Sequence, residues 1–164
     1  MNVLLLLTPK SEVKYIRETA TIRSALEKMR IHGYTAIPVI TKEGLYAGSV
    51  SEGDFLWYLI DKRHAEGGIP EDVRVKELIR PGYNPAVTAD ADRDTLIERA
   101  ENQNFIPVTD DRGTFIGIVT RKTVIERLCV PTQALKEEGL RSILPLPPYP
   151  RKGPDSTIHG QKTS

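Results

Sequence analysis

The alternation of hydrophobic and polar positions predicts one series of elements twice along the chain. Each series holds a short strand, an amphipathic helix, a hairpin of two strands and a second helix. The first series is expected at residues 13–16, from 21, at 36–40, at 45–50 and from 51. The second is expected at 86–88, around 96–100, at 105–109, at 114–119 and from 120. The chain is therefore predicted to be an α+β protein built from two β-α-β-β-α repeats.

The two series also match residue by residue. The hairpin and helix start at 38–51 recur at one constant offset as 107–120. The first helices need an offset that is two residues larger, so the second series lacks two residues near the end of its first helix. The segments before the repeats are alike as well, since Leu7-Thr8-Pro9 resembles Ile79-Arg80-Pro81. We therefore expect two structural units of one kind.

Glycine, proline and charge content places the domain boundaries. The first repeat is predicted at 1–60 and the second at 73–130, with an exposed linker at 61–72. Residues 131–164 are rich in proline, which predicts a C-terminal extension with little regular structure. The polar end of this extension is expected to be mobile from about residue 151.

Composition and charge exclude several classes of function. The 164 residues are 39% hydrophobic and 27% charged, as in ordinary globular proteins. A formal net charge of +1 provides no overall field for nucleic acid or a membrane surface, so neither is expected as a partner. The apolar run at 4–7 has no basic leader and is followed by Pro9, which favours a cytoplasmic protein.

Motifs for catalysis or metal binding are absent from the sequence. The single cysteine and the three histidines show no ligand spacing, and neither a phosphate loop nor a nucleophile elbow occurs. We therefore expect no enzyme activity, no metal site and no catalytic cofactor.

The strongest candidate site lies at the end of each hairpin, where a hydroxyl residue begins a helix. Ser51 is followed by Asp54 in the first repeat, and Thr120 holds the matching position in the second. A hydroxyl beside the free N–H groups of a helix start suits a phosphate, and a carboxylate three residues later suits two ribose hydroxyls. The same residues are also typical of a capping box, which needs no ligand.

The sequence around these positions resembles the tandem cystathionine-β-synthase (CBS) domain family. The resemblance rests on Gly33-Tyr34-Thr35-Ala36-Ile37-Pro38-Val39, Gly44 to Asp54, Phe105-Ile106-Pro107-Val108 and Asp111 to Thr123, and it covers roughly residues 4–130. It implies a Bateman module, in which two repeats pack through their sheets about a pseudo-twofold axis. In many members two clefts between the repeats bind adenosine derivatives.

The resemblance also implies which residues build each cleft. The first cleft would use Val50, Ser51 and Asp54, with an adenine-facing wall of Asn84, Pro85, Ala86, Asn104, Phe105 and Ile106. The second would use Thr120, Arg121, Lys122 and Thr123, together with Lys14, Tyr15, Ile16, Thr35, Ala36 and Ile37.

The two clefts differ in the chemistry of their residues. The first has Asp54 for a ribose, but Glu52 brings a negative charge near the phosphate. In the second, Thr123 stands where the family has its carboxylate, whereas Arg121 and Lys122 provide cationic donors for phosphate. These two cations also fit an ordinary solvated helix face. AMP, ADP, ATP and cyclic di-AMP all remain candidate ligands, and some small bacterial CBS proteins bind the cyclic dinucleotide.

Together these observations favour a non-catalytic regulatory module that binds an adenosine nucleotide and signals to a protein partner. The alternative is a structural or assembly domain with empty clefts, in which Ser51 and Thr120 serve only as caps. A hydrolase with Asp54 as its base lacks a nucleophile in the sequence. The resemblance further implies a homodimer, and the apolar residues Leu56, Trp57 and Ile60 fit a helical dimer face.

Overall fold

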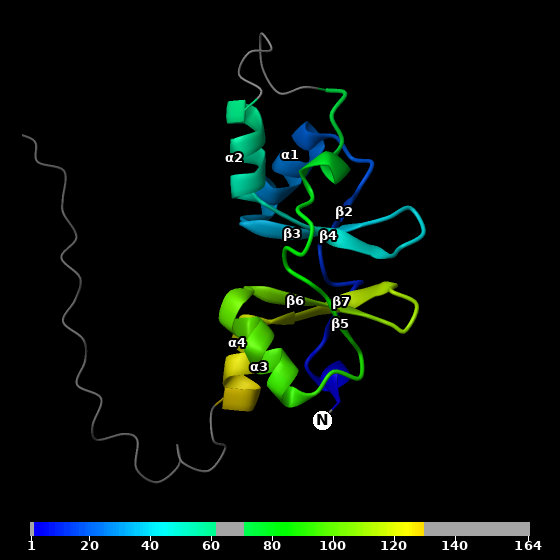
Figure 1. Ribbon diagram of the computed structural model, residues 1–164, viewed down its shortest axis with the longest axis vertical. Coiled ribbons are helices and arrows are strands. Elements are labelled where there is room, and N and C mark those ends of the chain that lie inside the picture. Colours follow the sequence, from blue (N-terminus) through cyan, green and yellow to red (C-terminus); the bar gives the residue numbers. More distant parts are fainter. Residues whose placement is uncertain (1, 62–70, 130–164) are drawn as a thin grey trace, which may run out of the picture. The chain divides into compact units, whose positions relative to one another are not determined.

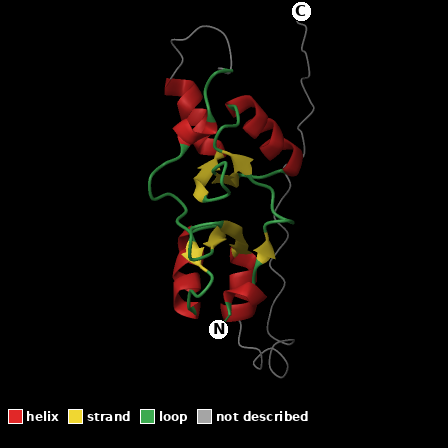
Figure 2. Ribbon diagram, turned by 90° about the vertical axis from the view of Figure 1, so that its right-hand side faces the viewer, coloured by secondary structure: helices red, strands yellow, loops and turns green. Residues whose placement is uncertain are grey.

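Residues 2–61 and 71–129 are described by a computed structural model, in which each repeat forms one β-sheet with two helices on one of its faces (Figure 1). The sheets of the two repeats face each other, and the helices lie on the outer sides, as the perpendicular view also shows (Figure 2). The predicted linker at 61–72 lies mostly, and the predicted extension at 131–164 entirely, outside the described residues.

The first repeat has a three-stranded sheet in the order β2, β3, β4, with β2 parallel and β4 antiparallel to β3. The prediction of a strand at 13–16 is wrong for residues 13–15, because only Ile16 and Arg17 pair with β3, opposite Val39 and Ile40. The elements of this repeat are β2 (Ile16–Arg17), α1 (Ile22–His32), β3 (Ala36–Ile40), β4 (Tyr46–Ser51) and α2 (Glu52–Asp61).

The second repeat has a four-stranded sheet in the order β1, β7, β6, β5. The helix predicted from residue 120 is α-helical for one turn and then continues as a π-helical turn, η3 (Ile125–Cys129). The elements of this repeat are β5 (Val87–Thr88), α3 (Arg93–Asn102), β6 (Phe105–Thr109), β7 (Phe115–Thr120) and α4 (Arg121–Val124).

Local signals in the sequence explain where the first helices begin and end. The side chain of Thr21 accepts the N–H of Ser24 at 3.2 Å, which confirms the predicted start of α1. Gly33 ends α1 in the left-handed conformation, with φ of 65°. Helix α3 has 10 residues, one fewer than the 11 of α1, and the connection to the next strand is also one residue shorter after α3. The second repeat is thus two residues shorter between the helix start and the next strand. The predicted two-residue deletion is thereby confirmed.

Hydrogen bonds between equivalent residues of the two hairpins define the symmetry. The Tyr46 N–H donates to the Gly113 carbonyl at 3.0 Å, and the Phe115 N–H donates to the Gly44 carbonyl at 3.0 Å. Leu45 and Thr114, which also occupy equivalent positions, form a β-bridge between these two bonds. Because equivalent residues exchange equivalent bonds, a pseudo-twofold axis relates the repeats, as the resemblance implied.

Each repeat packs against the segment that precedes the other repeat. Strand β1 (Thr8–Pro9) pairs antiparallel with β7, and Val3 in the turn η1 (Val3–Leu5) is buried in the second core. The turn η2 (Val75–Leu78) is correspondingly buried in the first core. The likeness of residues 7–9 and 79–81 thus reflects two lead-in segments that cross from one repeat to the other.

Two glycines make this crossing sterically feasible. Gly117 has φ of 157°, and a Cβ atom there would overlap the carbonyl oxygen of Thr8. Gly48, its equivalent on β4, has φ of 147°, and a Cβ atom there would lie 2.5 Å from Cγ2 of Ile79. The repeated glycine therefore leaves room for a lead-in segment beside β4 in the first sheet and beside β7 in the second.

Candidate functional site

Two cavities lie between the repeats, at the ends where β3 and β6 begin. Both are lined by Ala36 at the start of β3 and by Asn104 and Phe105 at the start of β6. The first has a volume of about 320 Å³ and the second of about 370 Å³, which are within the range of ~300 to 1,000 Å³ for small-molecule sites. They share three residues and are therefore neighbours.

The second cavity contains several of the residues predicted for the second cleft. Lys14, Thr35, Ala36 and Thr120 line it, so side chains from both repeats contribute. The remaining lining residues come from the lead-in segment, from the end of α1 and from the sheets: Thr8, Glu12, Val13, Gly33, Tyr34, Pro38, Asn104, Phe105 and Ile118. Tyr34 and Ile118 were not predicted as cleft residues, and the sequence pointed to them only because they lie next to or near Thr35 and Thr120.

Other residues predicted for the second cleft do not line this cavity. Ile16 and Ile37 are buried in the first core. Tyr15 packs edge-on against Phe115, with ring centroids 6.3 Å apart, and its carbonyl accepts a hydrogen bond from Lys28. The packing of these side chains therefore belongs to the fold and not to the lining of the cavity.

The cationic residues predicted for phosphate make contacts within the protein. The Arg121 Nε donates to the carbonyl of Gln103 at 3.1 Å, at the end of α3. Lys122 is exposed and its ammonium lies 3.8 Å from the Glu126 carboxylate, one helical turn later. The Thr120 hydroxyl accepts the N–H of Thr123 at 3.1 Å, as a helix cap does.

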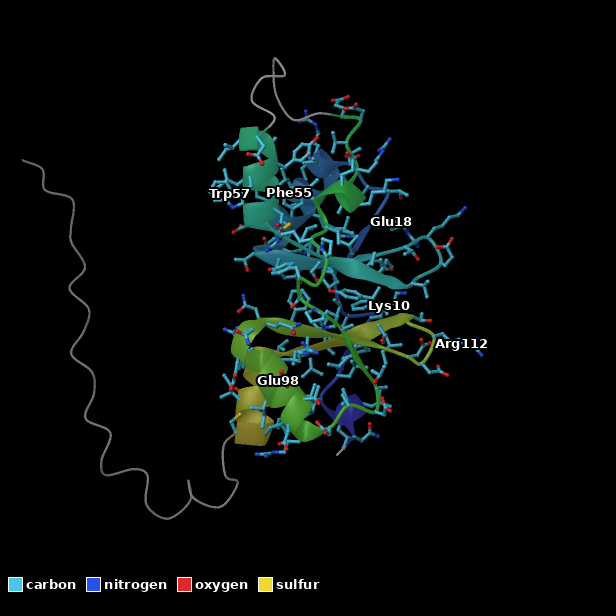
Figure 3. The ribbon with its side chains drawn as sticks, in the orientation of Figure 1. Lys10, Glu18, Phe55, Trp57, Glu98 and Arg112 are labelled. Carbon is cyan, nitrogen blue, oxygen red and sulfur yellow. The ribbon has the colours of Figure 1, made fainter. Side chains whose placement is uncertain are left out.

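The first cavity contains only one wall of the predicted first cleft. Asn84, Pro85, Asn104 and Phe105 line it, whereas Ile106 and Val50 are buried in the cores. Ser51, Asp54 and Ala86 do not line it. Its other residues are Ala36, Gly82, Tyr83, Glu98, Arg99, Asn102 and Gln103; Figure 3 labels Glu98 on α3.

The carboxylate of Asp54, which is predicted to hold a ribose, has protein partners in the structure. Its Oδ2 accepts hydrogen bonds from the Ser51 N–H at 2.8 Å and from the Ser51 hydroxyl at 2.7 Å. The Arg80 Nε lies 2.5 Å from Oδ1, and Nη2 donates to Oδ2 at 3.3 Å. The Asp54 side chain is only 7% exposed. Ser51 and Asp54 thus form a capping box that Arg80 closes from outside.

A buried polar network beside the first cavity joins the two repeats. The Asn84 side chain donates to the Ser49 hydroxyl at 3.0 Å and accepts from the Gln103 amide at 2.7 Å. The Tyr46 hydroxyl lies 2.8 Å from that of Ser49 and donates to the Asn84 carbonyl at 2.7 Å. Burial raises the pKa of Tyr46 from 10.0 to about 12, so its hydroxyl keeps its proton well into the alkaline range. Sequence analysis missed Tyr46, Ser49 and Gln103.

Symmetry makes the difference between the two cavities clear. Thr120 and Ile118 of β7 line the second cavity, but their equivalents on β4, Ser51 and Ser49, do not line the first. Ser49 is held by the polar network and Ser51 by Asp54. The second cavity therefore extends to the helix start after the hairpin, and the first does not.

The described residues contain neither a metal-binding cluster nor a membrane-spanning helix. No group of three or more His, Cys, Asp or Glu side chains within 2–61 and 71–129 could hold a metal ion. In the same part of the chain, none of the helices is both long and apolar enough to span a membrane.

Comparison with known proteins identifies the repeat. The sequence model of the CBS domain matches twice, at residues 6–61 and 75–129. An uncharacterized protein of Methanopyrus kandleri, MK0525, is 24% identical over 114 residues, which are 66% of this chain and 54% of that protein. The chain thus spans about half the length of this curated relative. The resemblance stated from the sequence motifs is confirmed.

Solved structures show the same fold. CbpB in complex with c-di-AMP is 22% identical with a TM-score of 0.70, and the match covers 77% of this chain and 83% of that chain. CBSX2 in complex with AMP is 24% identical with a TM-score of 0.61, and the match covers 76% of this chain and 93% of that chain. The predicted α+β fold of two repeats is therefore confirmed.

Proposed function

Because the chain belongs to the CBS-domain family and contains two copies of that domain, we propose that it is a regulatory module that binds an adenosine nucleotide between its repeats. CBS-domain proteins are generally regulatory modules without catalytic chemistry. The proposal includes a cytoplasmic location and a protein effector that responds to nucleotide binding. Binding at an interface between two units changes the relative stability of their arrangements, which is how such a signal can arise.

The observation that carries the proposal is the second cavity. Its aromatic and apolar side chains suit a purine, and they come from Val13, Tyr34, Pro38, Phe105 and Ile118. The hydroxyls of Thr8, Thr35 and Thr120 suit a sugar, and the Lys14 ammonium suits a phosphate. Since these residues belong to both repeats, a ligand here would contact both.

The similar structures support an adenosine nucleotide as the ligand class. CbpB was solved with c-di-AMP and CBSX2 with AMP. Within this class, AMP, ADP, ATP and cyclic di-AMP differ in how many phosphates must be neutralised. Lys14 is the one cationic side chain among the residues that line the second cavity, which favours a ligand of low charge such as AMP.

Calorimetric titration with AMP, ADP, ATP and cyclic di-AMP tests the proposal. Thr35 is exposed and lines only the second cavity of the two, so Thr35→Trp should fill that cavity without disturbing a core. The matched control is Thr19→Trp, at an exposed position outside both cavities. We expect Thr35→Trp to abolish binding at one site and Thr19→Trp to leave every affinity unchanged.

The contrary outcome supports the structural alternative. Ser51, Asp54 and Thr120 all act as helix caps, which is the observation that favours an assembly domain with empty clefts. If none of the four nucleotides binds the unaltered protein, this alternative replaces the sensing function. Binding that Thr35→Trp does not alter would move the site away from the second cavity.

We also propose a homodimer that forms through α2. Leu56 is 54% exposed, Trp57 62% and Ile60 38%, and Figure 3 shows Trp57 on the outer side of α2, opposite the buried Phe55. Exposed apolar clusters of this kind are typical of protein interfaces. Light scattering should give a dimer for the unaltered chain and a monomer for Trp57→Lys. The control is Ile31→Lys on α1, at an apolar residue that is 74% exposed.

A further inference from the structure

We propose that Arg80 makes the first cleft selective for adenosine ligands that carry an anionic group. The inference rests on the proposed nucleotide-binding function and adds the determinant of specificity in one of its clefts. It follows from the ion pair between Arg80 and Asp54, which involves both oxygens of the carboxylate.

The ion pair blocks the carboxylate that a ribose needs. Asp54 already accepts two hydrogen bonds from Ser51, and the guanidinium of Arg80 covers it from the solvent side. Its side chain is 7% exposed, whereas that of Arg80 is 53% exposed. A ribose can reach Asp54 only if Arg80 moves, and Arg80 has the solvent space to do so.

Arg80 contacts both Asp54 and a residue that lines the first cavity. Its guanidinium carbon is 3.8 Å from the ring centroid of Tyr83, and Tyr83 lines the first cavity together with Gly82 and Asn84. A ligand with its base in this cavity and its sugar at Asp54 would therefore pass Arg80. Cation–π stacking on Tyr83 keeps the guanidinium near that path after it leaves Asp54.

The chemistry of the exchange favours an anion. A neutral nucleoside that displaced Arg80 would separate a charge pair and offer the guanidinium no new counter-charge. A phosphate monoester can take over Arg80 through charge-assisted hydrogen bonds, and its ribose can then take Asp54. The phosphate thus replaces Asp54 as the partner of Arg80, and the ribose replaces Arg80 as the partner of Asp54.

The second cleft lacks this device. The lead-in residue equivalent to Arg80 is Thr8, which lines the second cavity itself, and Thr123 stands in place of Asp54. The two clefts are therefore expected to discriminate differently between AMP and adenosine, although they share a fold.

Titration of AMP and adenosine into the Thr35→Trp protein, in which the second cavity is filled, tests the proposal. We expect AMP to bind at least about tenfold more tightly than adenosine, which is the size of one charge-assisted hydrogen bond. Adding Arg80→Gln should weaken the binding of AMP and strengthen the binding of adenosine, so that the two affinities become similar. Arg80→Lys should retain the preference for AMP, and Arg112→Gln, at an exposed arginine on the β6–β7 turn, should change nothing.

Other outcomes overturn the proposal in distinguishable ways. If Arg80→Gln changes the affinities for AMP and adenosine by the same factor, Arg80 has a structural role only. If the unaltered protein binds AMP but the Thr35→Trp protein binds neither ligand, the first cleft is not a ligand site, and the proposed function stands without this inference. Absence of AMP binding to the unaltered protein refutes this inference, and only absence of binding by AMP, ADP, ATP and cyclic di-AMP alike refutes the proposed function as well. A circular-dichroism melting curve of Arg80→Gln verifies that the variant is folded.

Discussion

Replacing Asn84 tests whether the buried polar network holds the two repeats together. Asn84 is 8% exposed. Among the described residues other than glycine, Asn84 alone has a positive φ, which is 53°. Its amide connects Ser49 of the first repeat to Gln103 of the second. Asn84→Ala removes both hydrogen bonds and also places an alanine in the left-handed region. Asn84→Gly removes the same bonds but tolerates that conformation.

The expected magnitudes follow from these contacts. Neither partner is left without a bond, because the Ser49 hydroxyl still contacts Tyr46 and the Gln103 amide still donates to the Pro85 carbonyl at 3.1 Å. Two net hydrogen bonds are worth about 2 kcal/mol of unfolding free energy. A left-handed alanine adds about 1 kcal/mol. We therefore expect losses of about 3 kcal/mol for Asn84→Ala and about 2 kcal/mol for Asn84→Gly.

Urea unfolding followed by far-ultraviolet circular dichroism measures these losses. The control is Asn102→Ala. Asn102 is exposed and lines the first cavity, as Asn84 does, and its replacement should change the free energy of unfolding by less than about 0.5 kcal/mol. Equal losses for Asn84→Ala and Asn84→Gly would refute the argument from backbone conformation. A loss for Asn84→Gly no larger than that of the control would show that the network contributes no stability.

Three further predictions concern stability. Gly117→Ala should lower the free energy of unfolding in urea by at least about 1 kcal/mol more than Gly48→Ala does. The new Cβ meets a backbone oxygen at Gly117 but a side chain, which can move, at Gly48; equal losses would contradict this. Since the pKa of Tyr46 rises from 10.0 to about 12 in the folded state, stability should fall as pH rises through this range, and less so in Tyr46→Phe; parallel curves would disprove the assignment. Backbone N–H donors lower the pKa of Asp92 and Asp110 below 3.8, so their contribution is present above that pH and lost below it. The Asp92→Asn, Asp110→Asn double variant should lose less stability than the unaltered protein on acidification below pH 4, and an identical loss would refute this.

Helices and hairpins were predictable because their signals are local. The spacing of Ile22, Ala25 and Met29 shows one helix face, and all three side chains are buried in the first core. Thr21 and Gly33 mark the ends of the same helix through bonds that span three or four residues. The repeat strengthened each assignment, since one set of signals occurs twice.

The residues of the clefts were predictable only in part. Family resemblance indicated Lys14, Thr35, Ala36 and Thr120, which line the second cavity. It placed Asp54 in a ligand site as well, and this stays a prediction, but nothing in the sequence indicated that Asp54 also pairs with an arginine. The partner, Arg80, is 26 residues away and belongs to the segment before the other repeat.

The number of repeats, the order of their elements and the helix caps follow from the amino-acid sequence alone, since these depend on periodicity and on contacts between near neighbours. Long-range packing sets three other features: the lead-in segments cross between repeats, Asn84 and Gln103 join Ser49 in a buried network, and the second cavity extends to its helix start while the first does not. Each of these depends on which distant side chains meet across the pseudo-twofold axis. Two copies of one motif therefore build two unlike clefts. Ser49 and Asp54 of the first copy are replaced by Ile118 and Thr123 in the second, and the residues that face each copy also differ.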